Sequence, residues 1–121
     1  MEISNVKNFD EFINHVLNNE EIFSELNNWG KTVHIFLDGK NYYFDFSRAQ
    51  KNVLFFEADS EETFNFTIKT NFPIFKDILT EKIDPIETFA QGLIEVEGSF
   101  LELMEFAEII VEKIRNKKNI N

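Results

Sequence analysis

The spacing of the apolar residues changes from segment to segment, and this change most restricts the fold. Over residues 8–29 apolar residues recur at helical intervals, and Asn8 with Glu11 has the spacing of a capping box. The pair Asn18-Asn19 is expected to break this helix. Over residues 32–69 apolar and polar residues alternate in short runs, which is typical of half-buried strands. The chain is therefore predicted to open with helix and to continue with strands.

Four runs of this kind cover residues 32–38, 42–47, 53–58 and 64–69. The connections between them are short, and Asp38-Gly39 is a common hairpin sequence. Short connections join antiparallel neighbours, because a parallel pair needs a long crossover. The four runs therefore predict an antiparallel meander.

The second half of the chain returns to helical spacing. A helix is predicted over residues 73–82, and a short one begins at Asp84 and stops at Gly92. A fifth strand over 93–97, whose pairing direction stays open, precedes a last helix over 100–115 and a frayed tail at 116–121. The order α-β-β-β-β-α-α-β-α indicates an α+β domain with a five-stranded, mainly antiparallel sheet covered on one face by helices.

Length and charge limit the functions that this chain can have. Its 121 residues suit one domain, residues 1–121, and it contains no cysteine. The net charge of -10 argues against nucleic acid as a partner, because phosphate contacts need a basic surface. No apolar run is long enough for stable insertion into a membrane, and the first residues lack the pattern of a secretory signal. A cytoplasmic protein is therefore expected.

The sequence carries no motif for catalysis, metal binding or cofactor binding. It has neither a glycine-rich phosphate loop nor a nucleophile elbow. His15 and His34 are far apart in sequence and lack the spacing of metal ligands, so surface positions are expected for both. We therefore expect no enzymatic activity, no metal and no cofactor.

Phenylalanine is the residue type that stands out. The chain has 15 Phe but only two Tyr and one Trp. Phe buries a large apolar surface and has no polar group to satisfy. Two interpretations stay open at this point, a core rich in phenylalanine and an apolar cavity lined by some of the rings.

Residues 84–98 resemble a motif of the sterol carrier protein 2 family. The stretch reads DPIETFAQGLIEVEG: an acid-Pro helix start, a Gln-Gly turn, a charged-apolar strand and a glycine before the last helix. The element order of the rest of the chain is also similar to that family. Members often have glycine near Glu81 and Asp or Asn at Ser99; here Glu81 is expected to suit a helix and Ser99 to cap one.

The resemblance implies non-catalytic binding of a lipid in an apolar tunnel between sheet and helices. The ligand classes are fatty acid, acyl-CoA, sterol-like molecule or isoprenoid. The residues expected to line the tunnel are Phe44, Phe46, Phe66, Ile68, Phe75, Ile78, Leu79, Phe89, Met104 and Phe106.

A module that binds another protein and no ligand is the alternative. Leu101 and Ile109 fall on the charged side of the last helix, and Leu54, Phe56 and Ala58 share one face of the third strand. Such residues mark an interface if they are exposed. A homodimer, or an accessory to an enzyme of a lipid or isoprenoid-quinone pathway, would follow from this reading.

Overall fold

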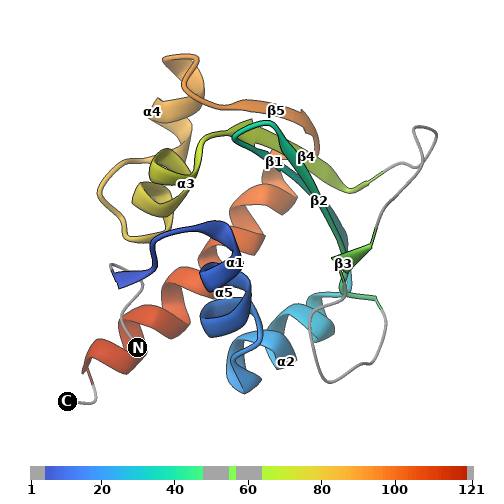
Figure 1. Cartoon of the computed structure of the whole chain (residues 1–121), viewed down its shortest axis with the longest axis vertical. Helices are drawn as coiled ribbons and strands as arrows, with labels where there is room; N and C mark the ends of the chain where they lie inside the picture. Colours follow the sequence, from blue (N-terminus) through green and yellow to red (C-terminus); the bar gives the residue numbers. More distant parts are fainter. Residues whose placement is uncertain (1–4, 48–54, 57–63, 120–121) are drawn as a thin grey trace.

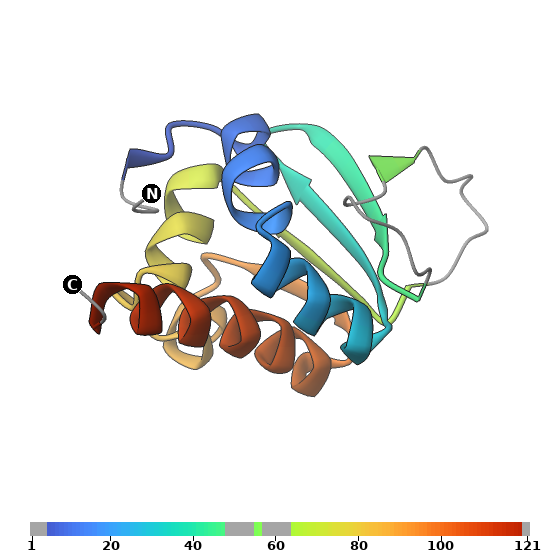
Figure 2. The same cartoon turned by 90° about the horizontal axis from the view of Figure 1, so that it is seen from below.

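The computed structural model describes residues 5–47, 55–56 and 64–119. Five strands form one sheet: β1 (Thr32–Leu37), β2 (Lys40–Asp45), β3 (Phe55–Phe56), β4 (Phe66–Thr70) and β5 (Glu95–Gly98). The helices are α1 (Phe9–Phe12), η2 (Ile13–Leu17), α2 (Glu20–Trp29), α3 (Phe72–Leu79), α4 (Pro85–Ala90) and α5 (Phe100–Asn119). Helices gather on one side of the sheet, as the two views in Figures 1 and 2 show. The predicted α+β class and the element order are confirmed.

The sheet is mixed, which corrects the predicted antiparallel meander. Its strand order is β3-β2-β1-β4-β5, so β4 lies beside β1 and not beside β3. The β1–β4 ladder is parallel and pairs Val33 with Phe66, whereas β1–β2, β2–β3 and β4–β5 are antiparallel. Four strands have four or more residues, and only two residues of β3 are described. The pairing of β5, which the sequence left open, is antiparallel.

The strand faces follow the predicted alternation. Val33, Ile35 and Leu37 of β1 are buried against the helices. His34, between them, lies on the opposite face, where its ring stacks on Tyr43 with the centroids 4.6 Å apart. Because one face is apolar and the other polar or aromatic, a register slip by one residue would expose the core.

The core is built largely from phenylalanine. Five rings are almost completely buried: Phe12, Phe44, Phe46, Phe66 and Phe106. Burying each Phe side chain contributes roughly 1.5–3 kcal/mol to folding. Together with four further buried Phe, nine of the 15 Phe are buried, so most of the phenylalanine in the sequence is used in the core.

Side-chain caps fix several helix ends where the sequence predicts them. The side chain of Asn8 accepts the backbone N–H of Glu11 at 2.9 Å, and the hydroxyl of Ser99 accepts that of Glu102 at 3.1 Å. The predicted break at Asn18-Asn19 separates α2 from the first helical segment, which includes a π-helical turn that the sequence did not predict. Gly30 ends α2 with φ 71°. Two lengths differ from expectation: α3 stops at Leu79 and α5 continues to Asn119.

Candidate functional site

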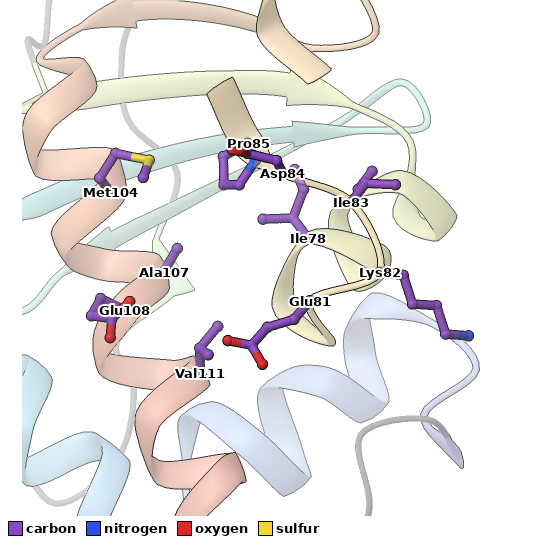
Figure 3. A pocket seen from close by; sticks show the side chains of 10 residues that line it. All are labelled: Ile78, Glu81, Lys82, Ile83, Asp84, Pro85, Met104, Ala107, Glu108 and Val111. Atoms are coloured by element: carbon purple, nitrogen blue, oxygen red, sulfur yellow. The ribbon is translucent and has the colours of Figure 1, made fainter. Parts of the chain in front are cut away.

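A cavity of about 290 Å³ lies between the end of α3, the loop to α4 and the middle of α5 (Figure 3). It is lined by Ile78, Glu81, Lys82, Ile83, Asp84, Pro85, Met104, Ala107, Glu108 and Val111. The walls are mainly apolar and the charged groups come from the loop and from α5. This volume lies just below the usual range for small-molecule sites, about 300–1,000 Å³.

The loop after α3 forms one wall and is fixed by its backbone. Lys82 and Ile83 donate their N–H groups to the carbonyl of Asp77 at 2.9 and 3.4 Å. Asp84 then caps α4 by accepting the N–H of Ile86 at 2.9 Å, and Pro85 occupies the first turn. The wall that faces the cavity is therefore held by local hydrogen bonds and by the start of α4.

Glu81 departs from the predicted helical conformation. It follows the end of α3 and has φ 63°, in the left-handed region that glycine adopts without cost. Its carboxylate forms an ion pair with Arg115 of α5. This positive φ gives a physical reason for the glycine that members of the sterol carrier protein 2 family often have near this position. In this chain the ion pair connects the loop after α3 to α5.

Helix α5 supplies the opposite wall. Ala107 and Glu108 lie three and four residues after Met104, and Val111 lies four and three residues after them, so the four residues share one side of the helix. Ala107 and Val111 are buried. The small side chain of Ala107 leaves space opposite Ile78, and the thioether of Met104 can adapt to a ligand.

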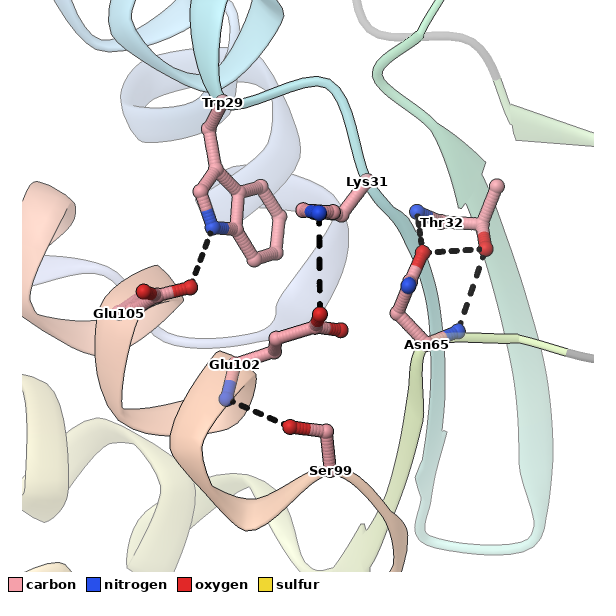
Figure 4. Close-up of polar contacts among 7 residues, drawn as sticks. All are labelled: Trp29, Lys31, Thr32, Asn65, Ser99, Glu102 and Glu105. Atoms are coloured by element: carbon pink, nitrogen blue, oxygen red, sulfur yellow. Dashed lines mark hydrogen bonds and ion pairs between the residues drawn. The ribbon is translucent and has the colours of Figure 1, made fainter.

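A groove of about 460 Å³ adjoins this cavity on the other side of Met104 and Glu108. Trp29, Met104, Glu105, Glu108, Ile109 and Glu112 line it. Figure 4 shows the indole Nε1 of Trp29 donating to Oε1 of Glu105, with 3.1 Å between these atoms. The cavity and the groove thus share two residues of α5.

The structure separates the residues predicted to line a ligand site into three groups. Ile78 and Met104 line the cavity. Seven lie in the buried core: Phe44, Phe46, Phe66, Ile68, Phe75, Leu79 and Phe106. Phe89 is 46% exposed and its ring packs against Phe100, with the centroids 5.3 Å apart. The predicted lining set does not include the wall residues Ile83, Pro85, Ala107 and Val111. The helical spacing places Ala107 and Val111 on the same face of the last helix as Met104, and this signal could have identified them.

The residues of the predicted protein interface differ in how far they are exposed. Leu101 is 70% exposed, as that interpretation requires. Ile109 is partly buried against the core and lines the groove. Leu54 and Ala58 lie outside the described residues, as does the side chain of Phe56.

The histidines show no catalytic or metal-binding arrangement within the described residues. His15 is exposed on η2. The ring nitrogens of His34 lie 3.2 Å from Thr67 Oγ1 and 2.8 Å from Asn41 Oδ1. In residues 5–47, 55–56 and 64–119 no three His, Asp or Glu side chains are arranged to hold a metal ion. The helices in that part of the chain are also too short or too polar to cross a bilayer.

A protein-family model matches most of the chain. The model of the SCP-2 sterol transfer family matches residues 9–111. That range contains every strand and helix from α1 to β5 and the cavity-lining part of α5. No significant match was found among curated protein sequences.

Solved structures with a similar fold have low sequence identity. The stereoselective inverting sec-alkylsulfatase Pisa1 from Pseudomonas sp. gives a TM-score of 0.70 at 15% identity, covering 86% of this chain and 16% of that chain. The UbiJ-SCP2 ubiquinone synthesis protein gives 0.65 at 12% identity, covering 88% of both chains. Sterol carrier protein 2 from Aedes aegypti, complexed with the C16 fatty acid palmitate, gives 0.50 at 17% identity, covering 78% of this chain and 94% of that chain. This chain therefore spans about one sixth of the sulfatase.

Proposed function

We propose, because this chain belongs to the SCP-2 sterol transfer family, that it binds and carries a lipid or other apolar small molecule without acting on it chemically. The family's general property is lipid binding or transfer. The candidate ligands are a fatty acid, an acyl-CoA, a sterol-like molecule or an isoprenoid. The unit that carries out this function is the single domain of residues 1–121, in the cytoplasm.

The observation that carries the proposal is the cavity between α3 and α5. Its apolar wall joins residues from two parts of the chain, Ile78 and Ile83 on one side and Met104, Ala107 and Val111 on the other. Figure 3 shows the Met104 thioether directed towards Pro85, and Ile78 directed into the space between the walls. A site of this kind holds an apolar chain without needing a specific polar contact.

Desolvation supplies the binding free energy in this proposal. Each buried methylene group contributes about 0.8 kcal/mol. A chain of twelve carbons would therefore gain roughly 10 kcal/mol if it were fully buried, before the costs of ordering it are subtracted. Micromolar affinity needs about 8.2 kcal/mol, so most of such a chain must be buried for a carrier of this affinity.

Native mass spectrometry of the protein purified from its host tests the proposal. A bound species of a few hundred daltons, lost on organic extraction, is the expected result. The extracted protein should then take up dodecan-1-ol. If it carries no lipid and takes up none, the carrier proposal is wrong.

A matched pair of variants connects any binding to the cavity. Ala107→Leu adds bulk to the buried wall, whereas Ala90→Leu makes the same change at an exposed position of α4. Binding of dodecan-1-ol should weaken at least tenfold in the first variant and stay unchanged in the second. If the two variants bind dodecan-1-ol with equal affinity, the ligand does not bind in this cavity.

A protein-interaction module is the second candidate, and the exposed apolar residues support it. Leu101, Ile86 and Leu93 are each about half exposed or more, as is Phe89. The partner is a second copy of this chain or an enzyme of a lipid or isoprenoid-quinone pathway. Under this proposal Leu101→Glu should turn a dimer into a monomer in sedimentation; an unchanged mass counts against a dimer at this surface.

A further inference from the structure

The charged groups at the cavity rim differ in how they are compensated. Glu81 is paired with Arg115, and Asp84 accepts a helix N–H. Lys82 is exposed, and Figure 3 shows its side chain extending away from the space between the walls. Glu108 has no ion-pair partner among the described residues. Among the described residues, Lys82 and Glu108 are thus the charged side chains of the rim without an ion pair or a capping hydrogen bond. Because Lys82 extends away from the space between the walls, the charge that borders both the cavity and the groove is the negative charge of Glu108.

The neighbouring groove adds charge of the same sign. Glu105 and Glu112 lie three and four residues from Glu108, so the three carboxylates follow one side of α5. Like charges at these intervals repel each other. The Trp29 indole hydrogen bond partly compensates Glu105.

Two lysines on α5 and beside it are paired with other carboxylates, and Lys82 extends away from the space between the walls. Lys113 pairs with Glu25 at 3.9 Å, and Lys31 pairs with Glu102 at 3.7 Å. The described residues thus place no cation on the stretch from Glu105 to Glu112. A polar group that arrives at the rim meets negative charge.

We infer that the cavity accepts amphiphiles with an uncharged or positively charged polar end and discriminates against carboxylates and phosphates. Glu108 is the residue that sets this preference, because it borders both the cavity and the groove. The inference rests on the proposed function, since it concerns the ligand of the same cavity. It narrows the candidates to sterol-like, isoprenoid or amine-bearing molecules and removes free fatty acids and acyl-CoA.

The physical basis is the position of the polar end. An amphiphile buries its apolar chain and keeps its polar end in water, so that end lies at the rim. There, a carboxylate would stand near Glu108 in a high but not fully aqueous dielectric, where charge–charge interactions are weakened yet not abolished. Two or three such interactions amount to at least about a tenfold difference in affinity between an anion and a neutral molecule.

Three probes with the same twelve-carbon chain test this inference: dodecyltrimethylammonium, dodecan-1-ol and dodecanoate. Affinities are measured below micelle concentrations by calorimetry and by the emission of Trp29, the single tryptophan. The expected order is ammonium, then alcohol, then dodecanoate, with at least about tenfold between the last two. Added salt should narrow the differences.

A charge-matched pair of variants identifies the residue responsible. Glu108→Gln should raise the affinity for dodecanoate at least threefold relative to the affinity for dodecan-1-ol measured on the same variant. Glu95→Gln removes the same charge from an exposed position of β5, away from the two lining sets, and should leave this ratio unchanged. An equal effect of both variants would assign the preference to net charge and overturn the role of Glu108.

The outcomes separate this inference from the carrier proposal. If dodecanoate binds as tightly as dodecan-1-ol, the charge preference is wrong and the carrier proposal stands. If none of the probes binds and the purified protein holds no lipid, the carrier proposal itself fails. Binding of dodecyltrimethylammonium that survives Ala107→Leu and is not displaced by dodecan-1-ol is surface ion pairing, and it too overturns the inference.

Discussion

Gly98 and Asn65 approach so closely that a Cβ atom on Gly98 would lie 2.6 Å from the carbonyl oxygen of Asn65. Gly98 ends β5 with φ 84°, and that carbonyl accepts the N–H of Ser99 at 2.9 Å. The side-chain Oδ1 of Asn65 also accepts the N–H of Thr32 at 2.8 Å (Figure 4). This contact joins the ends of β1, β4 and β5 to the start of α5.

Replacing Gly98 with alanine should therefore be strongly destabilising. The added methyl meets backbone atoms that cannot rotate away, in addition to the strain of a left-handed residue. We expect a loss of about 2–5 kcal/mol in the free energy of unfolding, measured by urea denaturation. Gly39→Ala is the control, because Gly39 has φ 82° and no atom within 4 Å of the added Cβ. It should lose only about 1–2 kcal/mol, and equal losses would contradict the steric argument.

Glu81 provides a second test of backbone strain. Glu81→Gly and Glu81→Gln both remove the exposed ion pair with Arg115, which contributes less than about 1 kcal/mol. Only the glycine variant relieves the positive φ of 63°. It should be more stable than the glutamine variant by about 1 kcal/mol in urea denaturation. A glutamine variant of equal or greater stability would show that the left-handed conformation carries no strain.

Phe89 and Phe106 should respond differently to truncation. Phe106 is buried between α5 and the sheet, so Phe106→Ala should cost about 3–5 kcal/mol. Phe89 is half exposed, so Phe89→Ala should cost less than about 1.5 kcal/mol. The folded Phe89→Ala protein should also keep its affinity for dodecan-1-ol. A tenfold loss of that affinity would show that Phe89 contributes to the ligand site.

Tyr42 gives a pH dependence of known sign. Burial, followed by the nearby carboxylates of Asp10 and Asp38, raises the pKa of Tyr42 above its ordinary value of 10.0. As pH rises past 10, the unfolded chain loses the phenolic proton first, so the free energy of unfolding decreases. Tyr42→Phe should show a smaller decrease between pH 9 and pH 11 in urea midpoints. An unchanged slope would mean that the phenol titrates alike in both states.

The sequence pattern predicted the helices and strands better than it predicted which strands lie side by side. The alternation of apolar and polar residues predicted which side of β1 is buried, and cap residues such as Asn8 and Ser99 predicted where helices begin. Neither signal reports which strand lies beside which. The parallel pairing of Val33 with Phe66 joins residues far apart in sequence, and nothing in their local pattern encodes it.

The same reasoning explains the partial prediction of the site. Periodicity identifies buried faces, and it does not distinguish a ring that fills space from one that borders a cavity. Phe66 and Phe106 are therefore indistinguishable in sequence from true lining residues. The cavity instead depends on a small residue, Ala107, and on loop residues such as Ile83, which have no pattern of their own. Whether the buried phenylalanines contact a ligand stays a prediction.

The strand order has a consequence for how the chain assembles. Every antiparallel ladder joins strands from the same half of the chain, β1 to β3 or β4 to β5, and the parallel β1–β4 ladder joins the halves. The sheet is thus two locally connected pieces meeting at one central seam. We expect two fragments, residues 1–47 and 64–121, to associate when mixed and to restore the Trp29–Glu105 hydrogen bond between them. The β1–β4 ladder is therefore the interface between the two halves of the sheet.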